Sequence, residues 1–320
     1  MSRRGWVLFA LMSVIWGIPY MLIKVAVGEV SASALVFART AIGAALLLPL
    51  VLRGGKLLLV WRHWRPALVF ALLEVLAPWW LLSDAEKRLS SSTTALLIAA
   101  APIIGVALAR LIGVERLDKV RCAGLVLGLI GVAVLVGPGL GGGDTWSITE
   151  VVLTAVAYAL APIVAVRYLQ DVPTLPLTVA CLGFAALVYA PAAVWTWPSV
   201  MPSGEVLIAI AALGVVCTGL AFVVYLELIK EAGPSRALLF IYVNPAVAVA
   251  AGVLLLNEPF TVLTVVSFVL ILAGCALATR STQSEGAAPP QAPQPAPPSP
   301  DLGSTEPPST LRGQSTPSAP

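Results

Sequence analysis

The stretch YVNPAVAVAAGVLLLNEPF, residues 242–260, repeats the layout of AAAPIIGVALARLIGVERL, residues 99–117. Each stretch has a proline, a long apolar run and then a glutamate. Pro102 and Glu115 are 13 positions apart, as are Pro245 and Glu258, and the two stretches are offset by 143 positions. A fixed offset of this kind predicts two copies of one structural unit.

The offset of 143 positions extends beyond these stretches without a gap. Chance matches of Leu and Ala are common in any apolar chain, but matches of Lys, Ser and Gly in the same register as the Pro–Glu pair are harder to obtain by chance. The further pairs are Lys87/Lys230, Ser92/Ser235, Leu96/Leu239, Ile98/Ile241, Gly131/Gly274 and Ala133/Ala276.

The composition indicates a membrane protein. Of the 320 residues, 59% are hydrophobic and 11% are charged, whereas soluble proteins carry about a quarter charged residues. The mean hydropathy is +0.95. We therefore expect the lipid bilayer as a partner, and no nucleic acid, because the net charge is only +3.

Ten apolar runs approach the length of about 20 residues that a membrane-spanning helix needs. Alternation with a period of two is absent, so helices are expected rather than a barrel. The first run is too long for a signal peptide and nine more follow it. The sequence therefore predicts an all-α integral membrane protein with ten transmembrane helices, at about 6–27, 32–52, 66–83, 93–113, 119–137, 149–168, 175–195, 205–227, 236–256 and 262–279.

The basic residues predict the orientation of these helices. Cytoplasmic connections are enriched in Lys and Arg. With the N-terminus inside, the outer connections carry only Lys87 and Arg88. We expect a multi-pass protein of the cytoplasmic (inner) cell membrane with both termini cytoplasmic. The basic residues on the inner side are Arg3, Arg4, Arg53, Lys56, Arg62, Arg65, Arg116, Lys119, Arg121, Arg167, Lys230, Arg236 and Arg280.

The repeat divides the chain into a first five-helix unit at 1–137, a second at 138–280, and a tail at 281–320. The tail is rich in Pro, Ser and Gln, so a disordered cytoplasmic segment is predicted. Because five is odd, the second unit enters the membrane inverted relative to the first. Inverted repeats of this kind are typical of secondary transporters.

Several motifs resemble EamA-type members of the drug/metabolite transporter superfamily over about residues 1–280. They are VIWGIPYMLIK (14–24), FARTAIGAALLL (37–48), AEKRLSSSTTALLIAAAPIIGVALARLIGVERL (85–117) and YLELIKEAGPSRALLFIYVNPAVAVAAGVLLLNEPF (225–260). The resemblance implies two inverted five-helix halves and efflux of a small-molecule substrate. The halves differ chemically, because Tyr158 stands where the first half has Trp16, and Arg39 has no counterpart.

The first span carries a stripe of candidate substrate-path residues. Trp16, Tyr20 and Lys24 are four positions apart and share one helix face with Ser13. An aromatic and cationic stripe is costly against lipid, so we expect it to line a path through the bundle. For Lys24 the alternative is that its side chain reaches up to the membrane interface.

Two charged residues within spans are further candidates. Arg39 is expected to bind a carboxylate or phosphate of the substrate, or else to form a structural pair. Glu74 is the candidate for proton coupling or for binding an amine, and a hydrogen-bonded structural glutamate is the alternative. The remaining candidates for the substrate path are Trp79, Tyr158, Thr218, Tyr242 and Asn244.

The glutamates of the opening stretches are expected to turn and cap helical hairpins. Asn257-Glu258-Pro259 would start the tenth helix, and Glu115-Arg116-Leu117-Asp118 the fifth. Gly124, Gly128 and Gly131 suit close helix packing, either within the halves or between the subunits of a homodimer.

Motifs of other function classes are missing from the sequence. HExxH, GxSxG and Walker A patterns do not occur, and neither does a Cys/His ligand set. We therefore expect no enzyme activity, no cofactor and no metal. The prediction is a secondary transporter that exports amino acids or related amphipathic metabolites by alternating access. The alternative is a membrane scaffold or sensor that acts through its Pro-rich tail.

Overall fold

The computed structural model describes residues 2–54, 57–111, 118–137 and 145–279, and every regular element within them is a helix. Nine helical segments in this part are long and apolar enough to cross a membrane, and the shorter apolar helix Val262–Ala278 follows them. The predicted all-α membrane fold is confirmed. Glu115, Arg116 and the tail at 281–320 lie outside the described residues.

The first half of the fold contains nine α-helices and one π-helical turn. Most spans are broken into two helices, and α4 is a short helix in the connection between the predicted second and third spans. The elements are α1 (Arg3–Gly17), α2 (Pro19–Ala26), α3 (Ala32–Gly54), α4 (Leu57–Arg62), α5 (Trp64–Ala71), η1 (Leu72–Leu76), α6 (Ala77–Ala85), α7 (Ser91–Ile98), α8 (Ala101–Leu111) and α9 (Lys119–Val136).

The second half repeats this order with fewer breaks. Its elements are α10 (Thr145–Tyr168), α11 (Thr174–Thr196), α12 (Gly204–Gly214), the π-helical turn η2 (Val215–Leu220), α13 (Ala221–Ala232), α14 (Pro234–Ala237), the 3₁₀ turn η3 (Leu238–Tyr242), α15 (Asn244–Leu256) and α16 (Val262–Ala278).

Two irregularities of the helices recur with the same offset of 143 positions. The π-helical turns begin at Leu72 and Val215, and the helices that follow the mid-span breaks begin at Ala101 and Asn244. In the first half, Pro78 explains the π turn, because it lacks the N–H that the Glu74 carbonyl would need four residues on. The repeat inferred from the sequence is therefore also a repeat of backbone geometry.

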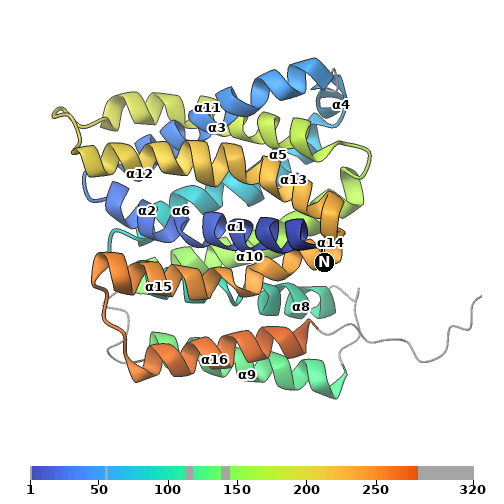
Figure 1. Ribbon diagram of the computed structural model, residues 1–320, viewed down its shortest axis with the longest axis vertical. Coiled ribbons are helices and arrows are strands. Elements are labelled where there is room, and N and C mark those ends of the chain that lie inside the picture. The colour runs from blue at the N-terminus through green and yellow to red at the C-terminus, as the bar shows by residue number, and fades with distance from the viewer. Residues whose placement is uncertain (1, 55–56, 112–117, 138–144, 280–320) are drawn as a thin grey trace, which may run out of the picture. The chain divides into compact units, whose positions relative to one another are not determined.

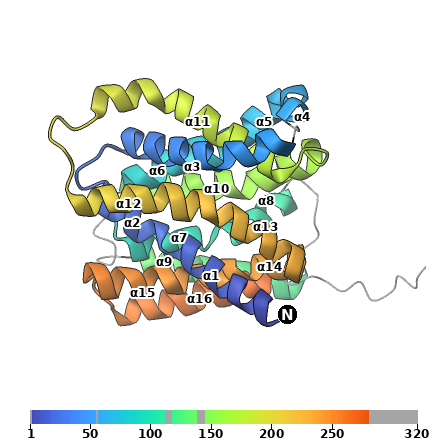
Figure 2. The ribbon, with the colours of Figure 1, turned by 45° about the horizontal axis from the view of Figure 1, so that its top comes forward.

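Connections between helices meet at two ends of the bundle, at the left and right of Figure 1. The α2–α3, α6–α7, α11–α12 and α15–α16 connections lie at the left end, which we call the Glu258 end (Figures 1 and 2). The helix α1 begins at the opposite end, which we call the N-terminal end. The orientation predicted from the basic residues would place the Glu258 end outside the cell.

The glycine stripe of α9 packs within the chain. A Cβ added to Gly274 of α16 would lie 2.4 Å from the backbone nitrogen of Gly128, and one added to Gly124 would lie 2.4 Å from that of Ala278. Two backbones come this close only where both helices carry small residues. The stripe therefore joins the last helices of the two halves, so it packs between the halves of one chain rather than within either half.

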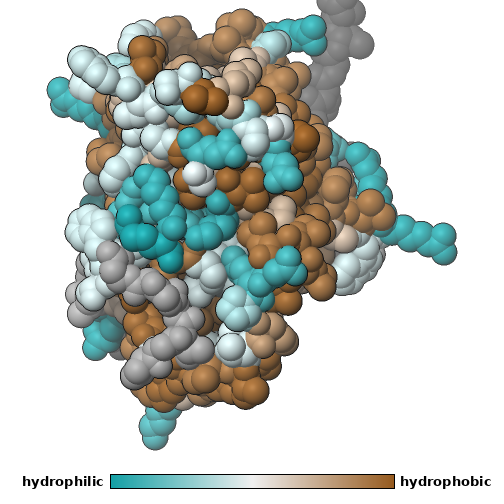
Figure 3. All heavy atoms as spheres, turned by 90° about the vertical axis from the view of Figure 1, so that its left-hand side faces the viewer, coloured by the Kyte–Doolittle hydropathy of each residue, from teal (hydrophilic) through white to brown (hydrophobic). Residues whose placement is uncertain are grey.

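The exposed side chains fit a surrounding bilayer. Many large apolar residues on the outside of the bundle are largely exposed, among them Leu187, Val194, Ile208 and Leu254, each at least 70% exposed. Figure 3 views the Glu258 end, where hydrophilic side chains gather near the middle of the face and hydrophobic ones cover much of the rest. Exposed apolar surface of this extent is expected of a protein in contact with lipid.

Candidate functional site

Arg39 joins the two halves of the molecule deep in the bundle. Its side chain is buried on α3, and Nε donates a hydrogen bond of 3.2 Å to Oγ1 of Thr218 on η2. The guanidinium carbon lies 3.7 Å from the ring centroid of Trp79 on α6. A desolvated cation–aromatic contact of this kind contributes about 2 kcal/mol. Three predicted site residues are therefore in direct contact.

The two π-helical turns make backbone carbonyls available to side chains in this region. A π turn interrupts the regular i→i−4 ladder, and such turns are frequent at functional sites. The carbonyl of Cys217 on η2 accepts a bond of 3.3 Å from Nε1 of Trp16, and the carbonyl of Leu76 on η1 accepts one of 2.9 Å from the Tyr189 hydroxyl. The turns thus fix two aromatic side chains.

Three further predicted residues interact with this group. The hydroxyl of Tyr158 on α10 is within the electrostatic range of Tyr20, Arg39 and Glu74, and it contacts the Trp79 side chain. Glu74 is half-buried on η1. We call Tyr20, Arg39, Glu74, Trp79, Tyr158 and Thr218 the central polar cluster.

Three other predicted residues lie toward the N-terminal end. The Trp16 ring packs against Tyr225 and Phe240, with centroids 5.4 and 5.2 Å apart. The Tyr242 hydroxyl is 2.6 Å from the hydroxyl of Thr279. In the orientation that satisfies its hydrogen bonds, the Asn244 amide donates to the carbonyls of Ser13 and Phe240.

Asn244 and Trp16 therefore hold α1 against the second half, because Ser13 and Trp16 both lie on α1. Helix α1 ends at Gly17 and α2 begins at Pro19. The stripe predicted on the first span is thus interrupted between Trp16 and Tyr20.

Lys24 lies at the Glu258 end and is tied to backbone. Its ammonium donates to the carbonyl oxygens of Glu86 and Leu89, at 2.7 and 2.8 Å. The side chain of Glu86 is completely buried beside it. Sequence reasoning missed Glu86 because it falls in a connection between spans, where acidic residues are normally exposed.

The expectation for Asn257-Glu258-Pro259 was wrong. Asn257 adopts the left-handed conformation, with φ 54°, and ends α15, while α16 begins later, with Thr261 as its N-cap. The Glu258 carboxylate instead accepts bonds from the backbone nitrogens of Ser91 and Ser92, at 2.7 and 3.0 Å, and from both hydroxyls. It caps α7 of the other half, where a negative charge suits the helix dipole.

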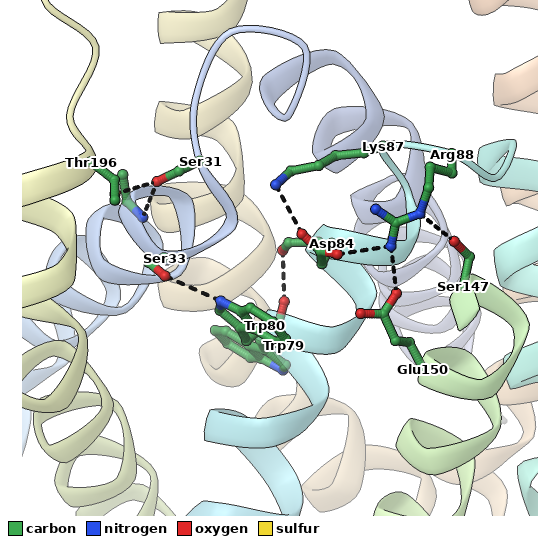
Figure 4. A network of polar contacts seen from close by, with 12 residues as sticks. Ser31, Ser33, Trp79, Trp80, Asp84, Lys87, Arg88, Ser147, Glu150 and Thr196 are labelled. Carbon is green, nitrogen blue, oxygen red and sulfur yellow. Dashed lines mark hydrogen bonds and ion pairs between the residues drawn. The ribbon is translucent and has the colours of Figure 1, made fainter. Parts of the chain in front are cut away.

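Further polar contacts connect the halves at the same end. In Figure 4, Arg88 reaches Glu150 and Ser147 of α10, at 2.9 and 2.6 Å. The same view shows Ser31 beside Thr196, at 2.6 Å. These contacts join the two halves at the Glu258 end.

A fourth contact between the halves lies in exposed connections at this end. The Glu29 carboxylate accepts a bond of 2.7 Å from the backbone nitrogen of Ser203. This bond lowers the pKa of Glu29 below its usual value.

At the N-terminal end the contacts between the halves are more exposed. Arg4 pairs with Glu227 at 3.0 Å, with two thirds of the Arg4 side chain exposed, and Nε of Arg121 donates to the carbonyl of Ala278 at 3.1 Å. Ser2 also donates to Glu231.

Comparisons with known proteins agree on one class of protein, membrane transporters. The description "EamA-like transporter family" matches residues 3–137 and 145–280, one copy in each half. An uncharacterized transporter of Archaeoglobus fulgidus is 24% identical over 277 residues, which cover 87% of this chain and 99% of the relative. The uncharacterized inner membrane transporter YedA of Escherichia coli K12 is 26% identical and covers 77% and 80%.

A solved structure, titled only as the crystal structure of a protein, has the same fold. It has a TM-score of 0.61 and 23% sequence identity over 87% of this chain and 97% of that chain. At this identity the likeness concerns the fold alone.

Proposed function

Because the chain belongs to the EamA-like transporter family of the drug/metabolite transporter superfamily, we propose that it is an exporter of small organic metabolites. Amino acids or related amphipathic solutes are the proposed substrates, and alternating access is the proposed mechanism. The protein is a multi-pass membrane protein. Its proposed location is the cytoplasmic membrane, with both termini inside.

The observation that carries this proposal is the Arg39–Thr218 hydrogen bond beside Trp79. It brings a cation, an aromatic face and a π-helical turn together where the two halves meet. In transporters built from inverted repeats, substrates bind near the midplane at the interface of the repeats, often beside broken helices. The central polar cluster likewise lies beside the π-helical turns η1 and η2, where the two halves meet.

The chemistry of the central polar cluster favours a solute that carries both a negatively charged carboxylate and a positively charged amine. The Arg39 guanidinium is a planar donor suited to a carboxylate, and Glu74 is the acid that would bind an amine or carry a proton. The faces of Trp79, Tyr20 and Tyr158 offer apolar contacts. We propose the remaining predicted residues Trp16, Lys24, Tyr242 and Asn244 as supports of the same path.

The contacts between the halves support a mechanism in which the ends open in turn. The Glu258 end is held by charged and backbone hydrogen bonds from separate connections. A carrier closed at this end must break these bonds in order to open there, and rocking of one half against the other would do so.

The test is counterflow exchange in sealed proteoliposomes containing the full chain. Vesicles loaded with one unlabelled solute are diluted into the labelled solute, with a panel of amino acids, amines and nucleosides. Exchange of an amino acid without ATP supports the proposal, and Arg39→Gln should abolish it. No exchange of any solute by correctly folded protein contradicts the proposed substrates.

The role of Glu74 needs a second comparison in the same vesicles. Glu74→Gln should abolish the stimulation by a pH gradient if Glu74 carries a proton, or the uptake of amines if it binds an ammonium group. Glu205→Gln is the matched control, because Glu205 is exposed in the first turn of α12.

A further inference from the structure

Glu86 is a completely buried acid without a hydrogen-bond partner for its carboxyl group. It lies in the connection between α6 and α7 and has 0% exposure. Among the residues that the structure describes, no donor has hydrogen-bond geometry toward either Oε1 or Oε2. The backbone of Lys24 lies near enough to lower the pKa of the carboxyl group, as the smallest of the influences on it. Buried acids are normally paired, so the carboxyl group requires an explanation.

The charged groups that face Glu86 from other elements are engaged elsewhere. They are Lys24 of α2, Arg39 of α3 and Glu258 of the α15–α16 connection, and the Tyr20 hydroxyl also faces it. Lys24 donates to the Glu86 carbonyl, not to its carboxyl, and Glu258 accepts from Ser91 and Ser92.

The charged residues next to Glu86 in the chain, Asp84 of α6 and Lys87 and Arg88 of the connection, are also paired. Asp84 accepts bonds from Lys87 and Arg88, at 2.9 and 2.8 Å, and Arg88 continues to Glu150. The Glu86 carboxyl therefore has charges around it but no direct counter-ion.

A proton is the simplest means of neutralising this group. Burial raises the pKa of the Glu86 carboxyl well above its usual range. The charge of Glu258 acts in the same direction, while Lys24 and Arg39 oppose it. An isolated carboxylate in an apolar environment normally takes up a proton rather than remaining charged.

The position of Glu86 links its protonation to the contacts that join the two halves at the Glu258 end. Its backbone carbonyl is bound by Lys24, and five residues later the Glu258 carboxylate holds the start of α7. Opening of the Glu258 end would break these contacts and admit water to the carboxyl group. Exposure to water returns the pKa of a glutamate toward its ordinary value.

We propose that Glu86 is a proton-binding site of the transport cycle, protonated while the Glu258 end is closed and deprotonated when this end opens. On opening, the carboxyl O–H bond breaks, the proton passes to water, and the electron pair stays on the carboxylate. The proposal rests on the proposed carrier function for its place in a cycle, but proton binding itself does not. It assigns the proton to a residue other than Glu74.

The first test is infrared difference spectroscopy of the full chain in lipid during a pH titration. The carbonyl band of a buried carboxylic acid should be present at neutral pH and be lost as the pH rises. Because Glu74 can contribute a band of its own, the comparison is made in the Glu74→Gln background, where a titrating band should remain and should be lost when Glu86→Gln is added. A titrating band of unchanged amplitude after Glu86→Gln is added overturns the proposal.

The second test separates proton coupling from exchange. With an exchanged solute from the panel, Glu86→Gln should keep counterflow but lose its stimulation by a pH gradient, and retained stimulation overturns the proposal. Because the infrared test needs no substrate, it gives a result even if the proposed carrier function fails. If Glu86→Gln does not fold, Glu86→Asp should shift the midpoint of the carbonyl titration, and an unmoved midpoint also overturns the proposal.

Discussion

The Oε1 atom of Glu258 lies 2.7 Å from the backbone nitrogen of Ser91, a residue 167 positions earlier in the chain. This bond, together with those to the Ser92 backbone nitrogen and to the two serine hydroxyls, attaches the α15–α16 connection of the second half to the start of α7 in the first half. The glutamate that marks the repeat in the sequence thus has a structural task between the repeats.

Removal of the Glu258 charge should loosen the Glu258 end. Glu258→Gln keeps the size of the side chain but leaves two backbone N–H groups with one neutral acceptor. Hydrogen bonds to charged groups contribute about 1.5–3 kcal/mol, so we expect about a tenfold shift toward an open end. The measurement is the rate of thiol labelling of Ala85→Cys, at a completely buried position at this end, in a background without the four native cysteines.

The exposed acid Glu205 provides the control for this experiment, since Glu205→Gln should leave the labelling rate unchanged. Equal labelling rates in the Glu258→Gln protein and its parent would show that the carboxylate does not hold this end.

The contact between α9 and α16 should be intolerant of a single methyl group. A Cβ at position 274 would meet backbone atoms of Gly128 at 2.4 and 2.5 Å, and backbone cannot move aside as a side chain can. We expect Gly274→Ala to destabilise the protein by about 1–3 kcal/mol, the usual cost of overpacking. Thermal unfolding in detergent measures this effect.

Gly183→Ala is the matched control, because nothing lies within 4 Å of the added Cβ on α11. A Gly274→Ala protein as stable as Gly183→Ala would contradict the close packing of these helices.

The sequence predicted the features that depend on local chemistry. The ten spans follow from the length of apolar runs. The breaks before Ala101 and Asn244 were not predicted, although Pro102 and Pro245 beside them can be read in the sequence. The π turn at Leu72–Leu76 was missed, although the cause, Pro78, can be read in the sequence. The turn at Val215–Leu220 contains no proline and needs tertiary contacts for its explanation.

The contacts of Glu86 and Glu258 could not be predicted in the same way. Local sequence indicates that a carboxylate lies near a helix end, but not which helix it reaches when the partner is more than a hundred residues away. Arg39 was identified because a cation within a span is unusual by itself. Its partners Thr218 and Trp79 were predicted only as separate candidates.

The geometry of the Arg39 side chain should matter as much as its charge. Arg39→Lys keeps the cation but loses the planar group that lies over Trp79 and donates to Thr218 through Nε. We expect exchange of amino acids to fall about tenfold, because a lysine does not replace a stacked, planar donor. Counterflow of a labelled amino acid measures this loss.

Amines without a carboxylate provide the internal control for Arg39. If Arg39 binds the carboxylate, any exchange of amines should be unaffected by Arg39→Lys. An equal loss for both classes of solute would assign Arg39 to the structure of the interface rather than to recognition.

Rising pH should open the Glu258 end. Between the ordinary pKa of a glutamate, about 4.3, and the raised pKa of buried Glu86, the closed arrangement binds a proton that the open one does not. The closed arrangement is therefore fully stabilised below this window, and the stabilisation is lost as the pH rises through it. Glu29 has a lowered pKa, so its contact weakens only as the pH falls below the same window.

Spin labels at Lys87→Cys and Phe260→Cys, one in each half at this end, would report the change as a distance distribution. We expect the distribution to move to longer distances as the pH rises in the parent protein. In Glu86→Gln it should stay short at every pH in the window, because the amide mimics the protonated acid. A parent distribution that does not depend on pH would show that proton binding at this end is not linked to its opening.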